Sequence, residues 1–156
     1  RTLGALYEVE NATLTKLVGN LPGLQALVGP AGILISSGGV NSVQLYTVRD
    51  GFLYTLPLAT LTEKCGWLET QVLCGVPTSL PAGIYPDDWL LGRAHTNDRL
   101  WLIDTENDVT IEVLNPEDEN APNMDMIKVQ VSPDGTFASF INKNDQTLWL
   151  LKLTTQ

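Results

Sequence analysis

The sequence predicts an all-β chain that forms a partial β-propeller, with two complete four-stranded antiparallel blades and a partial blade at each end. Short runs in which apolar and polar residues alternate, separated by Gly, Asn, Asp and Pro, are typical of strands. One phrase also recurs about every 40 to 55 residues, the spacing of propeller blades. It joins an apolar and an aromatic residue to a polar turn and a second apolar run, and its copies begin at Leu6-Tyr7, Leu45-Tyr46, Leu100-Trp101 and Leu148-Trp149.

The repeat divides the 156 residues into successive blades, each with strands a to d from the centre outward. Residues 1–20 are expected to be a partial blade, 21–58 a blade, 59–115 a second blade, and 124–156 a partial blade. The expected strands are c and d at 3–9 and 13–18; a to d at 24–28, 33–37, 43–48 and 52–56; a to d at 63–68, 71–76, 99–104 and 109–114; and a to c at 127–132, 137–142 and 147–153.

The segments between these strands are rich in turn-forming residues. Asp50-Gly51 is typical of a tight hairpin turn, and residues 133–135 (Pro-Asp-Gly) are typical of a turn between strands a and b. Residues 115–123, with two prolines and several acids, are expected to be a mobile connector. Residues 77–97 form an insertion between strands b and c of the second complete blade.

The aromatic residues of the repeated phrase are expected to pack between neighbouring blades. These residues are Trp101 and Trp149, with Tyr7 and Tyr46 at the equivalent places, and Trp67 is expected to do the same.

The expected blades are too few to close a propeller, which has typically four to eight. An open array leaves apolar blade faces and unpaired strand edges in water. We therefore expect further blades to complete the ring, either from the same longer chain or from another copy. The first residue is Arg1 rather than Met, which favours a processed product or a piece of a longer protein.

The charge of the chain excludes some classes of partner. Nine basic and eighteen acidic residues give a net charge of −9, while the apolar fraction of 44% is ordinary for a globular protein. Nucleic acid is not expected, because phosphate binding depends on clustered Lys and Arg. No apolar run has the length that spans a bilayer, so this segment is not expected to insert into a membrane.

The two cysteines are placed to face one another. If Glu69-Thr70 is the centre of a tight turn, Cys65 and Cys74 are direct cross-strand neighbours. Facing Cα atoms in an antiparallel pair lie about 4.5 to 5.5 Å apart, within the span of a disulfide. We expect a disulfide, which would indicate an oxidising compartment. Two buried thiols are the alternative, and a metal or redox role is the least favoured, since no second pair completes a site.

The second complete blade and the last blade share a set of residues with a known family. The set is Lys64-Cys65, Trp67, Leu73-Cys74, Val76-Pro77, Leu80-Pro81, Tyr85-Pro86-Asp87-Asp88-Trp89, Gly92, Leu100-Trp101, Ile103-Asp104, Ser132-Pro133-Asp134, Phe140, Asn142-Lys143 and Leu148-Trp149. In order and spacing it resembles the WD40-like, PD40 or TolB-type propeller found toward the C-terminal end of predicted cell-surface proteins of candidate-phylum bacteria. The resemblance implies a non-catalytic propeller outside the cytoplasm, at the cell surface or secreted. It brings no catalytic residues, no cofactor and no assigned ligand.

The insertion is the best candidate for a binding loop, because it interrupts a blade that would close without it. It gathers Tyr85, Asp87, Asp88, Trp89 and Arg93 within a few residues. Aromatic residues beside carboxylates suit recognition of carbohydrate or peptide. A structural role is nevertheless favoured over binding: the two aromatics fold onto the edge of the blade, and the carboxylates cap a turn or bond to backbone amides.

Catalytic and metal sites have weak support. Asp87 and Asp88 are adjacent in an extended segment and would point to opposite sides, so they do not converge on a bond as glycosidase carboxylates must. A calcium site that uses both is a minor alternative. His95 is the single histidine, which excludes a site with several histidines. No cofactor, no metal and no catalytic residue is predicted.

These expectations lead to a non-catalytic, extracytoplasmic propeller segment that acts as an interaction scaffold for a protein or a glycan. One alternative is a fragment of a sialidase-like or other carbohydrate-active propeller enzyme. The other is a self-assembling surface or filament subunit in which blade edges pair between copies.

Overall fold

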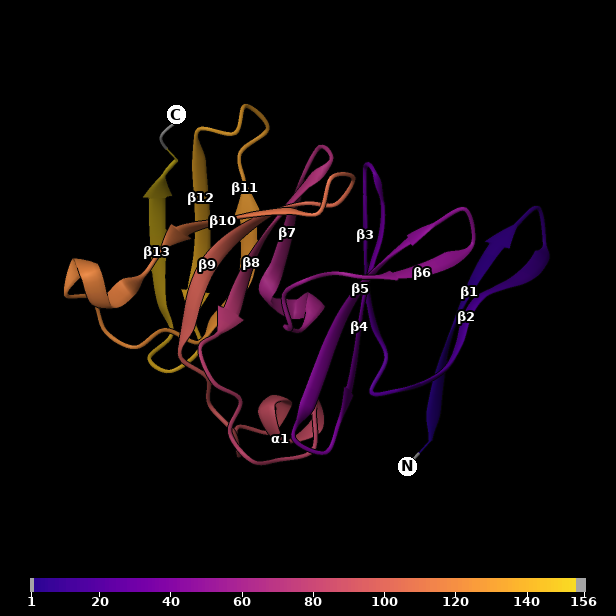
Figure 1. Ribbon diagram of the computed structural model, residues 1–156, viewed down its shortest axis with the longest axis horizontal. Helices are drawn as coiled ribbons and strands as arrows, with labels where there is room; N and C mark the ends of the chain where they lie inside the picture. The colour runs from indigo at the N-terminus through magenta and orange to yellow at the C-terminus, as the bar shows by residue number, and fades with distance from the viewer. Residues whose placement is uncertain (1, 154–156) are drawn as a thin grey trace.

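The computed structural model describes residues 2–153, and within them the protein is all-β apart from short helical turns (Figure 1). Four antiparallel sheets follow one another in chain order, and within each sheet the paired strands are consecutive in sequence. Two four-stranded sheets lie between a two-stranded sheet and a three-stranded sheet. The predicted partial propeller, with two complete blades and a partial blade at each end, is confirmed.

We name the sheets first, second, third and last in chain order. The first sheet contains β1 (Leu3–Glu10) and β2 (Thr13–Pro22), and the second contains β3 (Gln25–Gly29), β4 (Gly32–Gly39), β5 (Ser42–Arg49) and β6 (Phe52–Thr55). The third contains β7 (Cys65–Leu68), β8 (Gln71–Pro77), β9 (Asp98–Asp104) and β10 (Val109–Leu114), and the last contains β11 (Met126–Val131), β12 (Phe137–Asn142) and β13 (Thr147–Lys152).

Three helical turns interrupt the strands. The 3-10 helix η1 (Thr62–Lys64) precedes β7, so this strand begins at Cys65 and not at residue 63 as predicted. The 3-10 helix η2 (Pro116–Glu119) lies in the acidic connector that was predicted to be mobile, and the Asn115 side chain accepts a hydrogen bond from its N-terminal end. The α-helix α1 (Asp87–Leu90) lies in the insertion. In the described part of the chain, no helix is long and apolar enough to cross a membrane.

The hairpin turns set the register of the sheets. Asp50 and Gly51 both have positive φ, at 51° and 78°, as a type I′ turn requires. The predicted hairpin between β5 and β6 is therefore confirmed. Between β7 and β8, Leu68 pairs with Gln71 across the turn, and this register brings Cys65 opposite Cys74.

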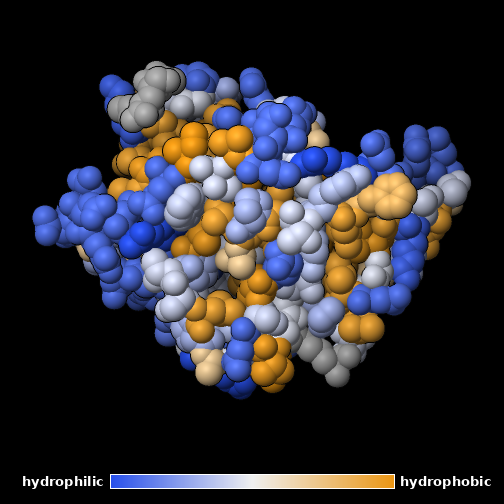
Figure 2. Space-filling view, in the orientation of Figure 1, coloured by the Kyte–Doolittle hydropathy of each residue, from blue (hydrophilic) through white to orange (hydrophobic). Residues whose placement is uncertain are grey.

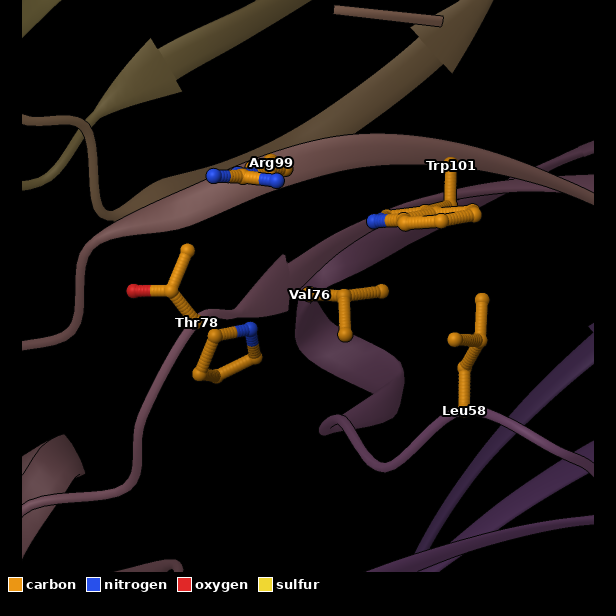
Figure 3. A pocket seen from close by; sticks show the side chains of 6 residues that line it. Leu58, Val76, Thr78, Arg99 and Trp101 are labelled. Carbon is orange, nitrogen blue, oxygen red and sulfur yellow. The ribbon is translucent and has the colours of Figure 1, made fainter. Parts of the chain in front are cut away.

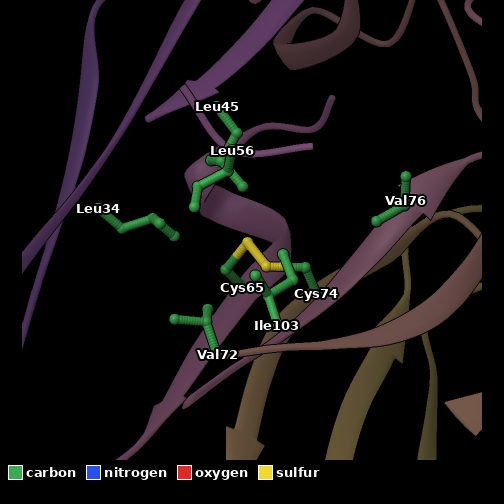
Figure 4. Close-up of a cluster of buried hydrophobic side chains, with 8 residues drawn as sticks. All are labelled: Leu34, Leu45, Leu56, Cys65, Val72, Cys74, Val76 and Ile103. Carbon is green, nitrogen blue, oxygen red and sulfur yellow. A yellow bond between two sulfur atoms is a disulfide. The ribbon is translucent and has the colours of Figure 1, made fainter. Parts of the chain in front are cut away.

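Cys65 and Cys74 form a disulfide, as predicted, with their Cα atoms 4.1 Å apart. Both half-cystines are buried, so the bond lies in the core between the second and third sheets (Figure 4). It closes a loop with a sequence separation of 9, so the chain-entropy model gives a stabilisation of about 2.5 kcal/mol.

Alternate residues of the second and third sheets build the core around this disulfide. Leu34, Leu45 and Leu56 meet Val72 and Ile103 there (Figure 4). These side chains are fully or almost fully buried, and burial of each apolar side chain contributes about 1.5 to 3 kcal/mol.

Two of the predicted aromatic contacts also lie at this boundary. Trp67 and Trp101 pack against the same core. The Trp67 ring lies so close to Gly29 that a Cβ atom there would be 2.2 Å from it, and the Trp67 indole N–H donates to the Leu27 carbonyl at 3.3 Å. Any side chain at position 29 would therefore clash with the Trp67 ring.

A second core joins the third sheet to the last. Its buried members are Leu73, Leu100, Met124, Met126, Val129, Ala138 and Phe140. Trp149 packs against this core, as predicted. The backbones of the third and last sheets come close together at Gly66 of β7, since a Cβ atom there would lie 2.2 Å from the carbonyl oxygen of Val129 in β11.

The two end sheets leave apolar side chains in water. Tyr7 is 47% exposed, so no blade of the described chain covers it, and its packing between blades stays a prediction that depends on a further blade beside the two-stranded first sheet. In the last sheet, Leu148 and Leu150 of β13 are exposed while Trp149 between them faces the core. Figure 2 shows apolar surface over the first sheet at the right and over the last sheet at the upper left.

Candidate functional site

The insertion, residues 77–97, folds across one face of the molecule and contacts the second sheet. Asn41, in the turn between β4 and β5, receives a bond from the Gly83 N–H and donates its own N–H to the Gly83 carbonyl, both at 2.8 Å. The Tyr85 N–H donates to the Gly39 carbonyl at 2.9 Å. A Cβ atom at Gly38 would lie 2.4 Å from the Tyr85 carbonyl oxygen, so the two backbones touch. Figure 1 shows α1 at the bottom of the view, beside this turn.

The same insertion reaches the last sheet through Trp89 of α1. The Lys143 ammonium donates to the Trp89 carbonyl at 2.5 Å and lies 4.6 Å from the centre of the indole ring. The Lys64 ammonium is 5.0 Å from the same ring. Two cations therefore lie close to the Trp89 ring, a contact that cation–π attraction favours. One loop thus ties the second, third and last sheets together.

Trp89 belongs to a group of buried residues that surround the Lys64 ammonium, here called the lysine cluster. Its members are Lys64, Trp89, Thr96, Asp98 and Asp125, each less than 5% exposed. The Lys64 ammonium donates to Thr96 Oγ1 at 2.7 Å, to Asp98 Oδ2 at 2.6 Å and to Asp125 Oδ1 at 2.5 Å. The Trp89 indole N–H lies 2.9 Å from each Asp125 oxygen. A buried charge of this kind is tolerated because it is paired and hydrogen-bonded.

The two carboxyl groups of the lysine cluster differ in their surroundings. Burial raises the pKa of Asp98 above its ordinary value, and the contact with Lys64 offsets part of that rise. Burial also acts to raise the pKa of Asp125, but Lys64, the Trp89 N–H and the Thr96 N–H together hold it below its ordinary value. Asp98 Oδ2 accepts from the Met126 N–H at 2.7 Å, whereas Asp98 Oδ1 is buried with no hydrogen-bond partner among residues 2–153.

The structure divides the predicted binding residues between the core and the surface. Tyr85 and Trp89 are buried, and the Tyr85 hydroxyl donates to the Pro81 carbonyl at 2.7 Å. Asp87 and Arg93 are exposed. Asp88 is half-buried, accepts from the Ile84 N–H at 2.7 Å and forms an ion pair with Arg93 at 3.4 Å. The two aromatics are thus buried, as the favoured structural interpretation expects, and ligand binding by this loop stays a prediction.

Sequence reasoning missed Lys64, Thr96, Asp98 and Asp125. A signal was present: Lys64 and Asp125 each come directly before an inner strand, and Asp98 is the first residue of β9. In a propeller blade these positions lie at the same end of the sheet, so charged residues there can converge.

Four large apolar side chains of the insertion and of the adjoining turn are exposed. Val40 and Ile84 form an isolated β-bridge, and their side chains are 72% and 45% exposed. Leu90 and Leu91, at the end of α1, are 49% and 64% exposed. We call Val40, Ile84, Leu90 and Leu91 the insertion patch.

A pocket of about 320 Å³ lies on the outer side of the insertion's base and was not anticipated from the sequence (Figure 3). Leu58, Val76, Pro77, Thr78, Arg99 and Trp101 line it. Figure 3 shows the Trp101 ring over Val76 and Leu58, with the Arg99 guanidinium at one side. Arg99 is paired with Glu112 at 3.2 Å. The pocket therefore offers apolar walls, the Thr78 hydroxyl, which donates to the Asn97 carbonyl at 3.1 Å, and an arginine that is paired with a carboxylate.

Metal-ligating groups do not converge in the described chain. Between residues 2 and 153, no three side chains of His, Cys, Asp or Glu are placed to share an ion. In the lysine cluster a cation already occupies the space between the two carboxyl groups.

Comparisons with known proteins identify no relative by sequence. No family model matches the chain, and no curated protein matches it. Among solved structures, TolB from Acinetobacter baumannii aligns over 97% of this chain and 49% of its own, with 8% identity and a TM-score of 0.39. The chain therefore spans about half the length of that protein. At this identity and TM-score the likeness bears on no function, and the fold assignment rests on the sheets themselves.

Proposed function

We propose that the protein is a non-catalytic, extracytoplasmic propeller segment that binds another protein through the insertion patch. The observation that carries this proposal is the exposure of Ile84, Leu90 and Leu91 on a loop whose backbone is fixed to three sheets, and of Val40 in the turn that pairs with Ile84. A fixed apolar surface suits protein binding, because little conformational entropy is lost when the partner docks.

The position of the aromatics favours a protein partner over a glycan. Sugar rings are commonly held against exposed aromatic faces, and the two aromatics of the insertion, Tyr85 and Trp89, are 0% and 1% exposed. The carboxylate of Asp88 is engaged by the Ile84 N–H and Arg93. The surface beside the exposed Asp87 and Arg93 carries the aliphatic side chains of the insertion patch, and aliphatic side chains suit the centre of a protein interface.

The lysine cluster supports a non-catalytic role. Asp98 and Asp125 both contact the Lys64 ammonium, and both are 0% exposed. A substrate from solution would have to displace the insertion to reach them. A hydrolase also needs a space for substrate between its carboxyl groups, and Lys64 occupies that space here.

The extracytoplasmic location is supported by the Cys65–Cys74 bond, since structural disulfides persist in oxidising compartments. Further blades are proposed to cover the end sheets, whose exposed Tyr7, Leu148 and Leu150 would be buried by a neighbouring blade. A longer natural chain or a second copy could supply them. Light scattering at micromolar concentration separates the two, because a second copy requires a concentration-dependent mass.

Peptides selected from a random displayed library against the immobilised protein provide the test of the insertion patch. Their dissociation constants are measured for the wild type, for Leu90→Glu/Leu91→Glu and for the control Val109→Glu/Ile111→Glu. The control changes two side chains with similar exposure, on the outer strand β10. We expect at least a tenfold loss of affinity for the first variant, the effect of removing an apolar anchor, and none for the control.

Peptides whose binding is unchanged by Leu90→Glu/Leu91→Glu would refute the role of the patch. A parallel screen against chromogenic glycosides tests the enzyme alternative. Turnover that depends on one carboxylate of this chain would refute the non-catalytic role.

A further inference from the structure

We propose that Lys64 and Asp98 become joined by an intramolecular isopeptide bond, formed within the folded protein with Asp125 as the group that transfers protons. The bond would be an amide between Lys64 Nζ and Asp98 Cγ. This modification is independent of the proposed partner and of the insertion patch.

The reacting groups already lie in contact. Lys64 Nζ is 2.6 Å from Asp98 Oδ2 and 2.5 Å from Asp125 Oδ1. The residues are held by η1, by the first residue of β9 and by the residue before β11, so the backbone fixes all three. Groups that reach near-attack geometry within a folded protein have effective concentrations of about 10⁵ to 10⁸ M, which would compensate for the low reactivity of a free carboxylic acid.

The two Asp98 oxygens have different partners, and this distinguishes their roles. Oδ2 accepts from the Met126 N–H at 2.7 Å, so this oxygen is held and its developing negative charge is stabilised. Oδ1 has no partner within residues 2–153 although it is buried. Oδ1 is therefore the oxygen that leaves, and Oδ2 remains as the amide carbonyl.

The step balances without an added reagent. Lys64 begins as the ammonium, Asp98 as the neutral acid and Asp125 as the carboxylate. Asp125 takes one proton from Nζ, and the free amine attacks Asp98 Cγ. The Nζ–Cγ bond forms, the Cγ–Oδ1 bond breaks, and Oδ1 leaves as water with the proton of the acid and a second proton from Nζ. The products are a neutral amide, one water molecule and neutral Asp125.

The environment favours this outcome. Burial raises the pKa of Asp98, which favours its neutral form. The pKa of Asp125 is lowered by Lys64, the Trp89 N–H and the Thr96 N–H against the effect of burial, so its carboxylate can act as the base. Trp89 covers the cluster and keeps bulk water away from the amide. The reaction also replaces a buried ion pair by a neutral bond, which removes the cost of keeping charges out of water.

The intact mass of the denatured and fully reduced wild-type protein tests the proposal directly and requires no variant. We expect a mass lower than the sequence mass by one water molecule. A mass equal to that of the sequence would overturn the proposal. The reduction step is needed because the disulfide also lowers the mass, by two hydrogen atoms.

A tryptic digest locates the bond. Trypsin cuts after Lys and Arg, so an unmodified chain yields a peptide that ends at Lys64, together with peptides 94–99 and 100–128, which contain Asp98 and Asp125 respectively. The proposed bond blocks cleavage after Lys64 and gives a branched product of residues 50–93 with residues 94–99. A branch to residues 100–128 instead would overturn the assignment of Asp98 as the acceptor.

Two variants separate the chemistry from the fold. Asp125→Asn removes the base, and we expect its mass to equal the sequence mass while circular dichroism shows the wild-type β spectrum. A folded Asp125→Asn protein that still loses one water would overturn the role of Asp125. In Asp98→Asn the same attack releases ammonia, so the matured variant should have the same mass as the matured wild type.

Discussion

Trp89 joins the insertion to the lysine cluster, and its replacement by Phe tests how much this contact stabilises the fold. The indole N–H lies 2.9 Å from each oxygen of Asp125, and the ring is 1% exposed. Phe keeps an aromatic ring over Lys64 but has no N–H. The Trp89→Phe variant therefore leaves a buried carboxyl group without its aromatic donor.

Two contributions set the magnitude. Loss of one hydrogen bond to a buried carboxylate, whose oxygens still accept from Lys64 and Thr96, costs about 1 to 3 kcal/mol, and loss of part of the buried ring adds on the order of 1 kcal/mol. The expected loss in the free energy of unfolding is therefore about 2 to 4 kcal/mol. For a chain of 156 residues, a loss of about 3 kcal/mol lowers Tm by about 6 to 12 °C.

Tyr85→Phe is the matched control, because it also removes one hydrogen-bond donor from a buried aromatic of the insertion. The Tyr85 hydroxyl donates to the Pro81 carbonyl, a neutral bond whose loss costs about 0.5 to 1.5 kcal/mol. Urea denaturation followed by far-UV circular dichroism, which reports on the backbone, gives the loss in the free energy of unfolding for both variants. If Trp89→Phe costs no more than Tyr85→Phe, the bond between Trp89 and Asp125 does not hold the insertion in place, and the reasoning is refuted.

Three further predictions follow from contacts described above. Reduction of Cys65–Cys74 should lower the free energy of unfolding by about 2.5 kcal/mol, and an unchanged urea midpoint with reductant would contradict this. Gly66→Ala should destabilise the fold by about 1 to 3 kcal/mol, because the new Cβ would lie 2.2 Å from the Val129 carbonyl oxygen. Gly39→Ala is the control, since the nearest atom to its Cβ would be the Ser42 hydroxyl oxygen at 3.1 Å, and it should cost less in the same thermal melt. The Ser132 and Thr136 hydroxyls lower the pKa of Asp134 to about 2. The contribution of this carboxylate to stability is therefore present above its ordinary pKa of 3.8 and is lost as the pH falls through about 2. A titration of the Asp134 carboxyl group by NMR with a midpoint near 3.8 would refute this.

The strands could be predicted from the sequence because their signals are local. Alternation of apolar residues marks β5 and β12, and Asp50-Gly51 marks the turn that follows β5. The disulfide was also predictable, since the turn at Glu69-Thr70 fixes the register of Cys65 and Cys74 over a few residues.

The lysine cluster was not predictable in the same way, because its members come from segments far apart in the chain. Lys64 and Asp125 are 61 residues apart, and a Lys before a strand is ordinarily a surface residue. Only the fold of residues 77–97 over that end of the third sheet excludes water from it. The same fold buries Trp89, which by composition alone suited ligand binding.

The attachment of the insertion to three sheets has a consequence for how the chain opens. The turn between β4 and β5, the lysine cluster and Lys143 are linked through one loop, so the second, third and last sheets should exchange their amide protons as one cooperative unit. The first sheet contributes Val18 to the core and has no bond to that loop among the described contacts. Its amides should therefore exchange earlier, while the remaining three sheets are still protected.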